Sequence, residues 1–273
     1  MDIFSRLQYG TVFSKWIQTQ RNFSVLDLSR ASIRDEVPRW FWSVSPFLGS
    51  LFLLDNQISG TIPSLSSMTS LSDLNLANNS ISGHISSFNA NVYSVVLSGN
   101  ILNGSISSIC EIRHGKLMFL DLSNNKLGGE VPNCWENVPN LGILNLAKNN
   151  FSSEIPPFLG SFILRFFQRL QLIDVGGNEL TGEIPTWIGE MHGMRNLNLG
   201  INKFHGRIPP EICNLTFIQI IDLSINNLSG KLPDCFNNFT QMARQDTDKS
   251  VFGLRFGSHM MLSFQMRLLY STL

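Results

Sequence analysis

The residues of this 273-residue chain that are best suited to chemistry are its four cysteines, five histidines and scattered hydroxyl and carboxylate side chains. None of the common catalytic patterns is present: there is no G-x-S-x-G, H-E-x-x-H or G-x-x-x-x-G-K-[ST] motif and no kinase loop signature. The cysteines include no C-x-x-C pair, and the histidines show no metal-ligand spacing. We therefore predict a protein that is not an enzyme, holds no metal and needs no cofactor.

The cysteines fall into two pairs, Cys110 with Cys134 and Cys213 with Cys235, whose members stand 24 and 22 positions apart. If the chain returned on itself at that interval, each pair would lie on neighbouring coils. Their Cα atoms would then fall within the window of about 4.4–6.8 Å that a disulfide requires. Buried thiols packed on the outer side of the coils are the alternative, and the spacing alone leaves both open.

A second set of reactive positions consists of sequons of the form N-x-S/T, the acceptors for N-glycosylation in a secreted protein. They begin at Asn22, Asn78, Asn103, Asn150, Asn214, Asn227 and Asn238. Several of these sequons lie beside an asparagine that recurs in a sequence repeat, and the consensus of that repeat itself supplies the serine. The repeat therefore explains why some of the sequons occur.

That repeat must determine how the cysteines and the sequons are arranged in space. The template L-x-x-L-x-L-x-x-N-x-L-x-G-x-I-P recurs nine times between residues 23 and 233, at intervals of about two dozen residues. The first copy has Ala31 in the asparagine position. The other copies hold Asn56, Asn79, Asn100, Asn125, Asn149, Asn178, Asn202 and Asn226. One copy cannot bury its apolar face alone, so the copies must stack into a solenoid with a shared core.

Each template position has a structural reason. The L-x-L step predicts a short strand that points residues such as Leu120 and Leu122 inward. Stacking places these strands about 4.8 Å apart in a parallel sheet on the concave side. The asparagine amide can donate to and accept from backbone groups that the next turn leaves unpaired. The glycine suits a tight turn and the proline ends the hydrogen bonding.

The ending L-x-G-x-I-P resembles the plant-specific class of leucine-rich repeat, over residues 9 to about 240. The runs SSIC…FLDLSNNKLGGEVPNCW and IPPEIC…IIDLSINNLSGKLPDCFNNFT are similar to later ectodomain repeats of plant receptor-like proteins, especially the xylanase-elicitor and defence receptors. The resemblance implies an α/β-type leucine-rich-repeat solenoid. That fold is a right-handed curved superhelix with a parallel concave β-sheet and short 3₁₀ or irregular convex segments, and it leaves room for a short second sheet.

The repeats divide the chain into residues 1–22, a partial first coil, residues 23–240, a solenoid of about nine repeats, and residues 241–273, a tail that abandons the template. The family implies a location at the extracellular face of the plasma membrane. We expect this chain itself to lack a signal peptide and a transmembrane span. Its start has no continuous apolar run, and it contains no uncharged apolar stretch of about 20 residues. The implied oxidising apoplast favours the two disulfides over free thiols.

Because no catalytic pattern is present, we predict that the protein binds another molecule. Twenty basic and twenty acidic residues give no net charge, which argues against a nucleic-acid partner. Strand alternation points the residue between the two inward leucines, and the residue two positions earlier, towards the concave face. Apolar residues there should be exposed and act as interface anchors in coils two to seven. The predicted ligand-facing residues are Phe52, Asn75, Val96, Phe119, Asp121, Ile143, Asn145, Leu172 and Asp174. Alanine at Phe52 or Phe119 should weaken binding without unfolding the protein.

The resemblance implies an extracellular ligand-recognition fragment of a receptor-like protein. Its ligand would be a protein, peptide or glycan elicitor, and a co-receptor kinase would transmit the signal. A secreted inhibitor of microbial cell-wall-degrading enzymes is one alternative, against which the irregular coil lengths and missing cysteine caps argue. The other alternative is a non-functional truncated remnant of a receptor gene, which predicts neither secretion nor a phenotype.

Overall fold

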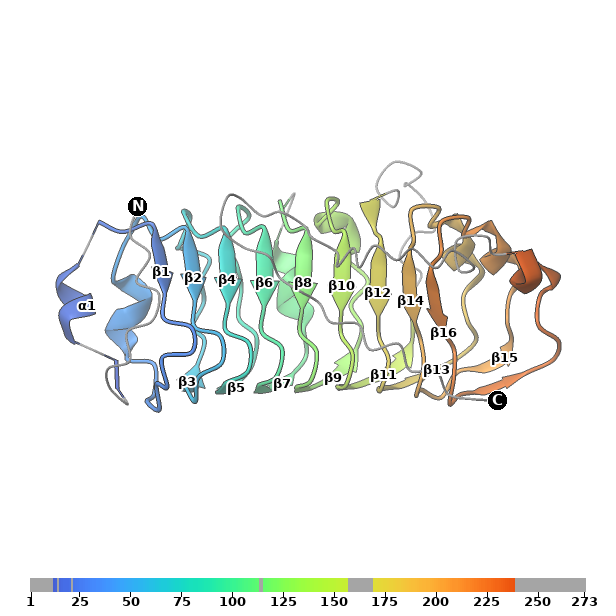
Figure 1. Cartoon of the computed structure of the whole chain (residues 1–273), viewed down its shortest axis with the longest axis horizontal. Helices are drawn as coiled ribbons and strands as arrows, with labels where there is room; N and C mark the ends of the chain where they lie inside the picture. The colour runs from blue at the N-terminus through green and yellow to red at the C-terminus, as the bar shows by residue number, and fades with distance from the viewer. Residues whose placement is uncertain (1–11, 14, 21, 113–114, 157–168, 239–273) are drawn as a thin grey trace.

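A computed structural model describes residues 12–13, 15–20, 22–112, 115–156 and 169–238, and every structural statement below concerns these residues. Within them the chain winds into an elongated array of stacked coils (Figure 1). The predicted tail, 241–273, lies outside the described residues, as do residues 1–11 of the predicted partial coil. The boundaries 1–22, 23–240 and 241–273 therefore remain predictions.

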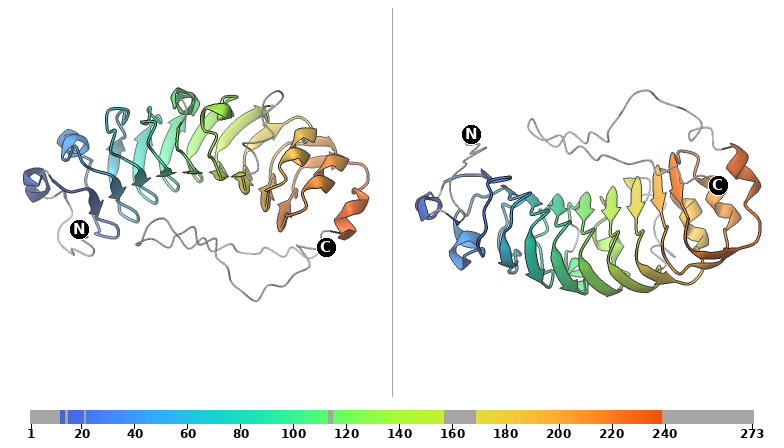
Figure 2. Two further views of the ribbon diagram at one scale, coloured as in Figure 1. Left: turned by 90° about the horizontal axis from the view of Figure 1, so that it is seen from above. Right: turned by 60° about the horizontal axis from the view of Figure 1, so that its bottom comes forward.

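One short strand from each coil contributes to a nine-stranded parallel sheet, the main sheet. Its strands, which number the coils from one to nine, are β1 (Val25–Asp27), β2 (Ser50–Phe52), β4 (Asp73–Asn75), β6 (Ser94–Val96), β8 (Phe119–Asp121), β10 (Ile143–Asn145), β12 (Leu172–Asp174), β14 (Asn196–Asn198) and β16 (Ile220–Asp222). The strands stand side by side in chain order (Figure 1) and line the inner side of the curve (Figure 2). This arrangement confirms the parallel concave sheet that the template predicts.

A second sheet runs along one edge of the array, where Figure 1 shows its strands below the main sheet. It contains β3 (Ser59–Thr61), β5 (Ser80–Gly83), β7 (Ile101–Gly104), β9 (Lys126–Glu130), β11 (Asn150–Glu154) and β13 (Glu179–Thr181), and a separate pair follows, β15 (His205–Arg207) with β17 (Asn227–Ser229). The template glycine is required here: Gly182 has a φ of +85°, and an added Cβ would lie 2.6 Å from Cγ of Glu154 on the preceding coil.

The outer side of the curve is formed by short helical turns (Figure 2). They are the α-helix α1 (Lys15–Thr19) and the 3₁₀ helices η1 (Arg39–Ser43), η2 (Ser107–Glu111), η3 (Trp135–Asn137), η5 (Thr186–Glu190), η6 (Pro210–Asn214) and η7 (Asp234–Asn238). The Ile-Pro or Val-Pro step positions three of them, because Pro38, Pro185 and Pro209 are the N-caps of η1, η5 and η6 with φ between −67° and −69°.

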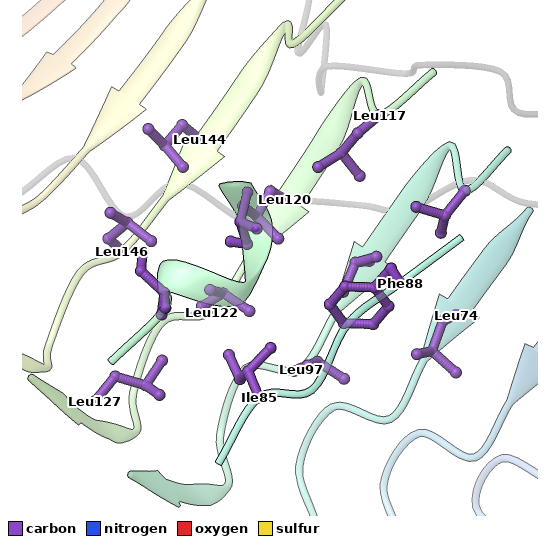
Figure 3. Close-up of a cluster of buried hydrophobic side chains, with 14 of the residues drawn as sticks. Leu74, Ile85, Phe88, Leu97, Leu117, Leu120, Leu122, Leu127, Leu144 and Leu146 are labelled. Carbon is purple, nitrogen blue, oxygen red and sulfur yellow. The ribbon is translucent and has the colours of Figure 1, made fainter. Parts of the chain in front are cut away.

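The interior of the coils is a single apolar core that extends from the first coil to the last. Leu120 and Leu122 are 1% and 0% exposed, and Figure 3 shows them beside Leu144 and Leu146 of the next coil. In coil nine, where no further coil follows within the described residues, the equivalent Ile221 is only half-buried. Each coil therefore depends on its neighbours to exclude water.

The template asparagines form a continuous ladder of buried or half-buried amides between the coils. Asn125 is typical: its Oδ1 accepts from the backbone N–H of Leu102 at 3.0 Å, and its Nδ2 donates to the carbonyls of Leu97 at 3.0 Å and Leu122 at 3.1 Å. Leu97 and Leu102 belong to the preceding coil, so each asparagine joins two coils. The pattern repeats at Asn56, Asn79, Asn100, Asn149, Asn178, Asn202 and Asn226.

Candidate ligand-binding face

The register of the main sheet aligns its outward side chains in two rows. Lane one consists of Val25, Ser50, Asp73, Ser94, Phe119, Ile143, Leu172, Asn196 and Ile220, and lane two consists of Asp27, Phe52, Asn75, Val96, Asp121, Asn145, Asp174, Asn198 and Asp222. All nine predicted ligand-facing residues lie in these lanes. The parallel pairing therefore places on one face residues that are as much as 122 positions apart in the sequence, from Phe52 to Asp174.

The centre of this face is buried, which corrects the expected exposure of its apolar residues. Val96, Phe119 and Ile143 are only 5%, 2% and 5% exposed, and with Ala77 they form a second apolar cluster, separate from the main core. Adjacent strands are about 4.8 Å apart, so bulky side chains of neighbouring coils pack against one another. Leu172 packs against this cluster but remains half-buried. Phe52, elsewhere in the lanes, is also half-buried and does not belong to the cluster.

The polar residues of lane two have a structural role that the sequence argument did not assign. The Oδ1 atoms of Asn75, Asp121, Asn145 and Asp174 each accept from the backbone N–H two residues further on, at 2.9–3.1 Å. The same bond occurs at Asp27, Asn198 and Asp222. These side chains close the turn after the strand. Asn75, Asp121 and Asn145 are also buried, so their side chains are not open to solvent as predicted ligand-facing residues would be.

Asp121 is the most deeply buried of the lane aspartates, with 4% of its surface exposed. Burial raises the pKa of its carboxyl group, against the lowering effect of hydrogen bonds from Ser123 and Ser98. Asp174 is similar: burial raises its pKa, hydrogen bonds from Gly176 and Asn198 lower it, and the charges of Asp121 and Asp222 raise it further. Aspartates on alternate coils thus act on one another along lane two.

The raised pKa of Asp121 predicts that Asp121→Asn stabilises the protein at neutral pH. A carboxyl whose pKa is higher in the folded state than in the unfolded state favours folding while it is protonated. It loses that advantage as the pH rises through the folded pKa. The asparagine can keep the bond from the Ser123 N–H and has no charge to bury. We expect a melting temperature a few degrees higher at pH 7 and a smaller gain at pH 4.

The control is Asp27→Asn, because Asp27 makes the same backbone bond in lane two but is half-buried. Each substitution creates an N-x-S sequon, so the proteins are produced in the bacterial periplasm, where N-glycans are not added. Thermal melts of both variants and the parent at pH 4 and pH 7 measure the effect. A gain for Asp121→Asn that is equal at the two pH values would contradict the assignment to the buried charge.

The cysteines lie on the outer side of the curve, away from the lanes. Cys110 is bonded to Cys134 and Cys213 to Cys235, with Cα–Cα distances of 5.4 and 5.5 Å. The first bridge joins η2 to the residue before η3, and the second joins η6 to η7. Each bridge therefore links two neighbouring coils, as the spacing allows.

The sequon asparagines also avoid the lanes. The side chains of Asn22, Asn78, Asn103, Asn150, Asn214 and Asn227 are exposed, while the side chain of Asn238 lies outside the part that the structure describes. Asn103 and Asn150 belong to the second sheet and Asn227 to β17, whereas Asn214 ends η6 on the outer side. Glycans at Asn103, Asn150, Asn214 and Asn227 would leave the concave face uncovered.

The described residues include neither a metal-binding cluster nor a membrane-spanning helix. Among them, no group of three or more histidine, cysteine, aspartate or glutamate side chains is arranged to hold a metal ion. None of the helices within the described ranges has both the length and the apolar character needed to cross a membrane.

A row of left-handed residues precedes the ladder, and sequence reasoning missed it. The backbone has a positive φ at Arg30, Asp55, Asn78, Gly99, Asn124, Lys148, Gly177, Ile201 and Ile225. Glycine and asparagine occupy this position in four coils, which was an available signal. The left-handed conformation is least favourable at Ile201 and Ile225, because a β-branched side chain disfavours it.

Ile225→Asn is therefore expected to stabilise the protein by about 1 kcal/mol. Ile225 has a φ of 52° and is 71% exposed, so its replacement relieves strain and removes little packing. Urea unfolding measures the change. The control is Ile101→Asn, since Ile101 is also exposed, at 42%, but lies in strand β7 and is absent from the positive-φ residues. A gain at both positions would show that lower surface hydrophobicity, not backbone strain, is responsible.

Comparison with known proteins agrees with this geometry. The Leucine Rich Repeat family model matches residues 116–138, 140–162, 169–191 and 217–239. Receptor-like protein EIX2 of Solanum lycopersicum is 42% identical over 199 residues, which cover 66% of this chain and 20% of that protein. Receptor-like protein EIX1 of the same plant is 47% identical over 199 residues, covering 66% of this chain and 19% of the relative. The chain is a leucine-rich-repeat array of the plant receptor-like protein type.

This leucine-rich-repeat array spans about a fifth of the length of the curated relatives it matches. Receptor-like protein 35 of Arabidopsis thaliana is a further relative, 34% identical over 197 residues, which cover 69% of this chain and 18% of the relative. These proteins are named as receptors, in agreement with the prediction that the array is not an enzyme.

Solved structures share the fold of the array. The Arabidopsis receptor kinase HAESA, crystallised with the peptide hormone IDA and the co-receptor SERK1, matches with a TM-score of 0.70 and 30% identity, covering 79% of this chain and 36% of that one. A plant ice-binding protein matches with a TM-score of 0.66 and 25% identity, covering 77% and 66%. The same coils thus occur in proteins of different function.

Proposed function

We propose that this leucine-rich-repeat array is an extracellular ligand-recognition segment of a plant receptor-like protein. The observation that carries the proposal is its 42–47% identity to two tomato receptor-like proteins over 66% of the chain. The ligand would be a protein, peptide or glycan elicitor present outside the cell. A partner receptor kinase would transmit the signal, as the resemblance to receptor-like proteins implies.

The geometry supports the concave face as the binding surface. The lanes run without interruption across nine strands, and the six exposed sequon asparagines all lie elsewhere. Half-buried lane residues can contact a ligand directly, and among those predicted they are Phe52, Leu172 and Asp174. The buried Val96, Phe119 and Ile143 would support the surface from beneath, because their side chains are packed together. The disulfides agree with a protein that acts in an oxidising compartment.

The test is a binding measurement on the full chain secreted from plant cells behind an added signal peptide. A panel of a fungal xylanase, short peptides and chitin oligomers is passed over the immobilised protein by biolayer interferometry. We expect at least one member to bind, and Phe52→Ala to weaken that binding at least fivefold. The control is Phe47→Ala, since Phe47 is 59% exposed but lies outside both lanes.

The proposal fails if no member of the panel binds. It also fails if Phe47→Ala weakens binding as much as Phe52→Ala does, because the contact would then not involve the lanes. Treatment of the secreted chain with a peptide N-glycosidase tests whether the sequons accept glycans, with a loss of mass as the expected result.

A further inference from the structure

The concave face has a charge that the chain as a whole does not have. The chain contains 20 basic and 20 acidic residues. The two lanes hold Asp27, Asp73, Asp121, Asp174 and Asp222 and not one lysine, arginine or histidine. Stacking has therefore collected negative charge on one face of an electrically neutral molecule, and a ligand for that face should have the opposite sign.

The accessible part of this charge lies near the C-terminal end of the lanes, in coils seven to nine. Asp174 and Asp222 are both half-buried and lie on either side of Asn198 in lane two. Two strand spacings place them about 10 Å apart. Each uses Oδ1 for the backbone bond that closes its turn, so the carboxylates are held in position before a ligand arrives.

Apolar side chains lie directly beside these carboxylates. Leu172 and Ile220 are the lane-one residues of the same two strands, each two positions before its aspartate, and both are half-buried. Asn196 separates them in lane one. The surface is therefore a square of two acidic and two apolar groups, with amides between them. Such a pattern suits a partner that combines positive charge with apolar side chains.

Opposite charge in these coils lies outside the lanes. Lys203 is paired with Glu179 at 2.9 Å, and both follow the ladder positions on the side of the second sheet. Arg195 stands before β14, at the entry to the strand. The repulsion that the charges of Asp121 and Asp222 exert on Asp174 agrees with a shortage of neutralising charge within lane two.

We propose that coils seven to nine of the concave face bind a basic peptide, with two lysine or arginine side chains paired to Asp174 and Asp222 and an apolar residue packed on Leu172 or Ile220. This inference rests on the proposed function and names its ligand class. A peptide in the polyproline II conformation rises about 3.1 Å per residue with three residues per turn. Basic residues three positions apart therefore lie on one face, about 9 Å apart, and match the spacing of the two carboxylates. Such pairs give specificity and a salt-dependent affinity.

The experiment uses the full chain produced in the bacterial periplasm, where disulfides form and N-glycans are not added, because Asp222→Asn and Asp27→Asn each create an N-x-S sequon with Ser224 and Ser29. Two labelled probe peptides are compared, acetyl-Lys-Leu-Leu-Lys-Leu-Leu-amide and its counterpart with glutamate for lysine. Fluorescence anisotropy is measured in 20 and 300 mM NaCl. We expect the basic peptide to bind, with an affinity at least tenfold lower in the higher salt, and the acidic peptide to bind at least tenfold more weakly than the basic one. The double variant Asp174→Asn, Asp222→Asn should lose at least tenfold in affinity for the basic peptide, because the amides keep the turn bonds but not the charge.

Asp27→Asn is the matched control, since Asp27 makes the same turn bond in coil one of lane two. We expect its affinity to stay within twofold of the parent. Equal binding of the two peptides, an unchanged affinity in the double variant, or an equal loss for Asp27→Asn would each overturn the inference. If an uncharged or acidic ligand binds and Phe52→Ala or Leu172→Ala abolishes that binding, recognition by the concave face survives and only the basic class is rejected.

Discussion

Phe119→Ala is expected to lower the free energy of unfolding by about 3–5 kcal/mol, the usual cost of removing a buried phenylalanine. The side chain is 2% exposed and packs with Val96 and Ile143 of the adjacent coils. Its loss would leave a cavity that the neighbouring strands, fixed by their hydrogen bonds, can fill only in part. Urea denaturation followed by circular dichroism measures the change.

Phe52→Ala is the matched comparison, because Phe52 stands in the neighbouring lane but is half-buried and belongs to neither of the two buried apolar clusters. We expect it to cost about 1 kcal/mol or less. In the prediction from sequence, Phe52 and Phe119 are equivalent exposed anchors. Equal and small losses for both variants would restore that interpretation and contradict the buried cluster.

Asn149→Ala is expected to cost about 3–5 kcal/mol, because one side chain satisfies several buried backbone groups. Oδ1 of Asn149 accepts from Leu127 at 3.1 Å, and Nδ2 donates to Leu122 at 3.0 Å and Leu146 at 3.1 Å. Each backbone group left unpaired in the interior costs about 1–3 kcal/mol. Chemical denaturation of the variant and the parent gives the difference.

The control is Asn150→Ala. Asn150 is the next residue in the chain, is exposed, and has its side chain outside the ladder. We expect its substitution to change stability by less than about 0.5 kcal/mol. A comparable loss in both variants would mean that alanine disturbs strand β11 as a whole and that the amide bonds are not the cause.

The fold could be predicted from the sequence because its information is local and repeated. Leu120 and Leu122 show alternation, Asn125 shows where the turn begins, and the same signals return in every coil. The exception at Ala31 also has a reason. The ladder amide reaches back to the preceding coil, and the residues described before coil one contain no strand to supply those partners.

The accessibility of the concave face could not be predicted in the same way. The alternation of inward and outward residues along each strand indicates that Phe119 and Val96 point away from the main core. It does not indicate that Ala77 and Ile143 of other coils pack beside them. Burial depends on side-chain volume in neighbouring coils, which a single copy of the template does not encode. The turn bonds of Asn75 and Asp174 were missed for a related reason, because the pattern shows a polar residue but not its partner.

The second disulfide determines how the array can come apart. Coil nine is the last described coil, and its Ile221 and Leu223 are half-buried, whereas the equivalent residues of the other eight coils are buried. The Cys213–Cys235 bond fastens this coil to its neighbour covalently. A mild reductant should therefore expose the last coil to proteases while the interior coils resist, and unravelling would start from that end and proceed coil by coil.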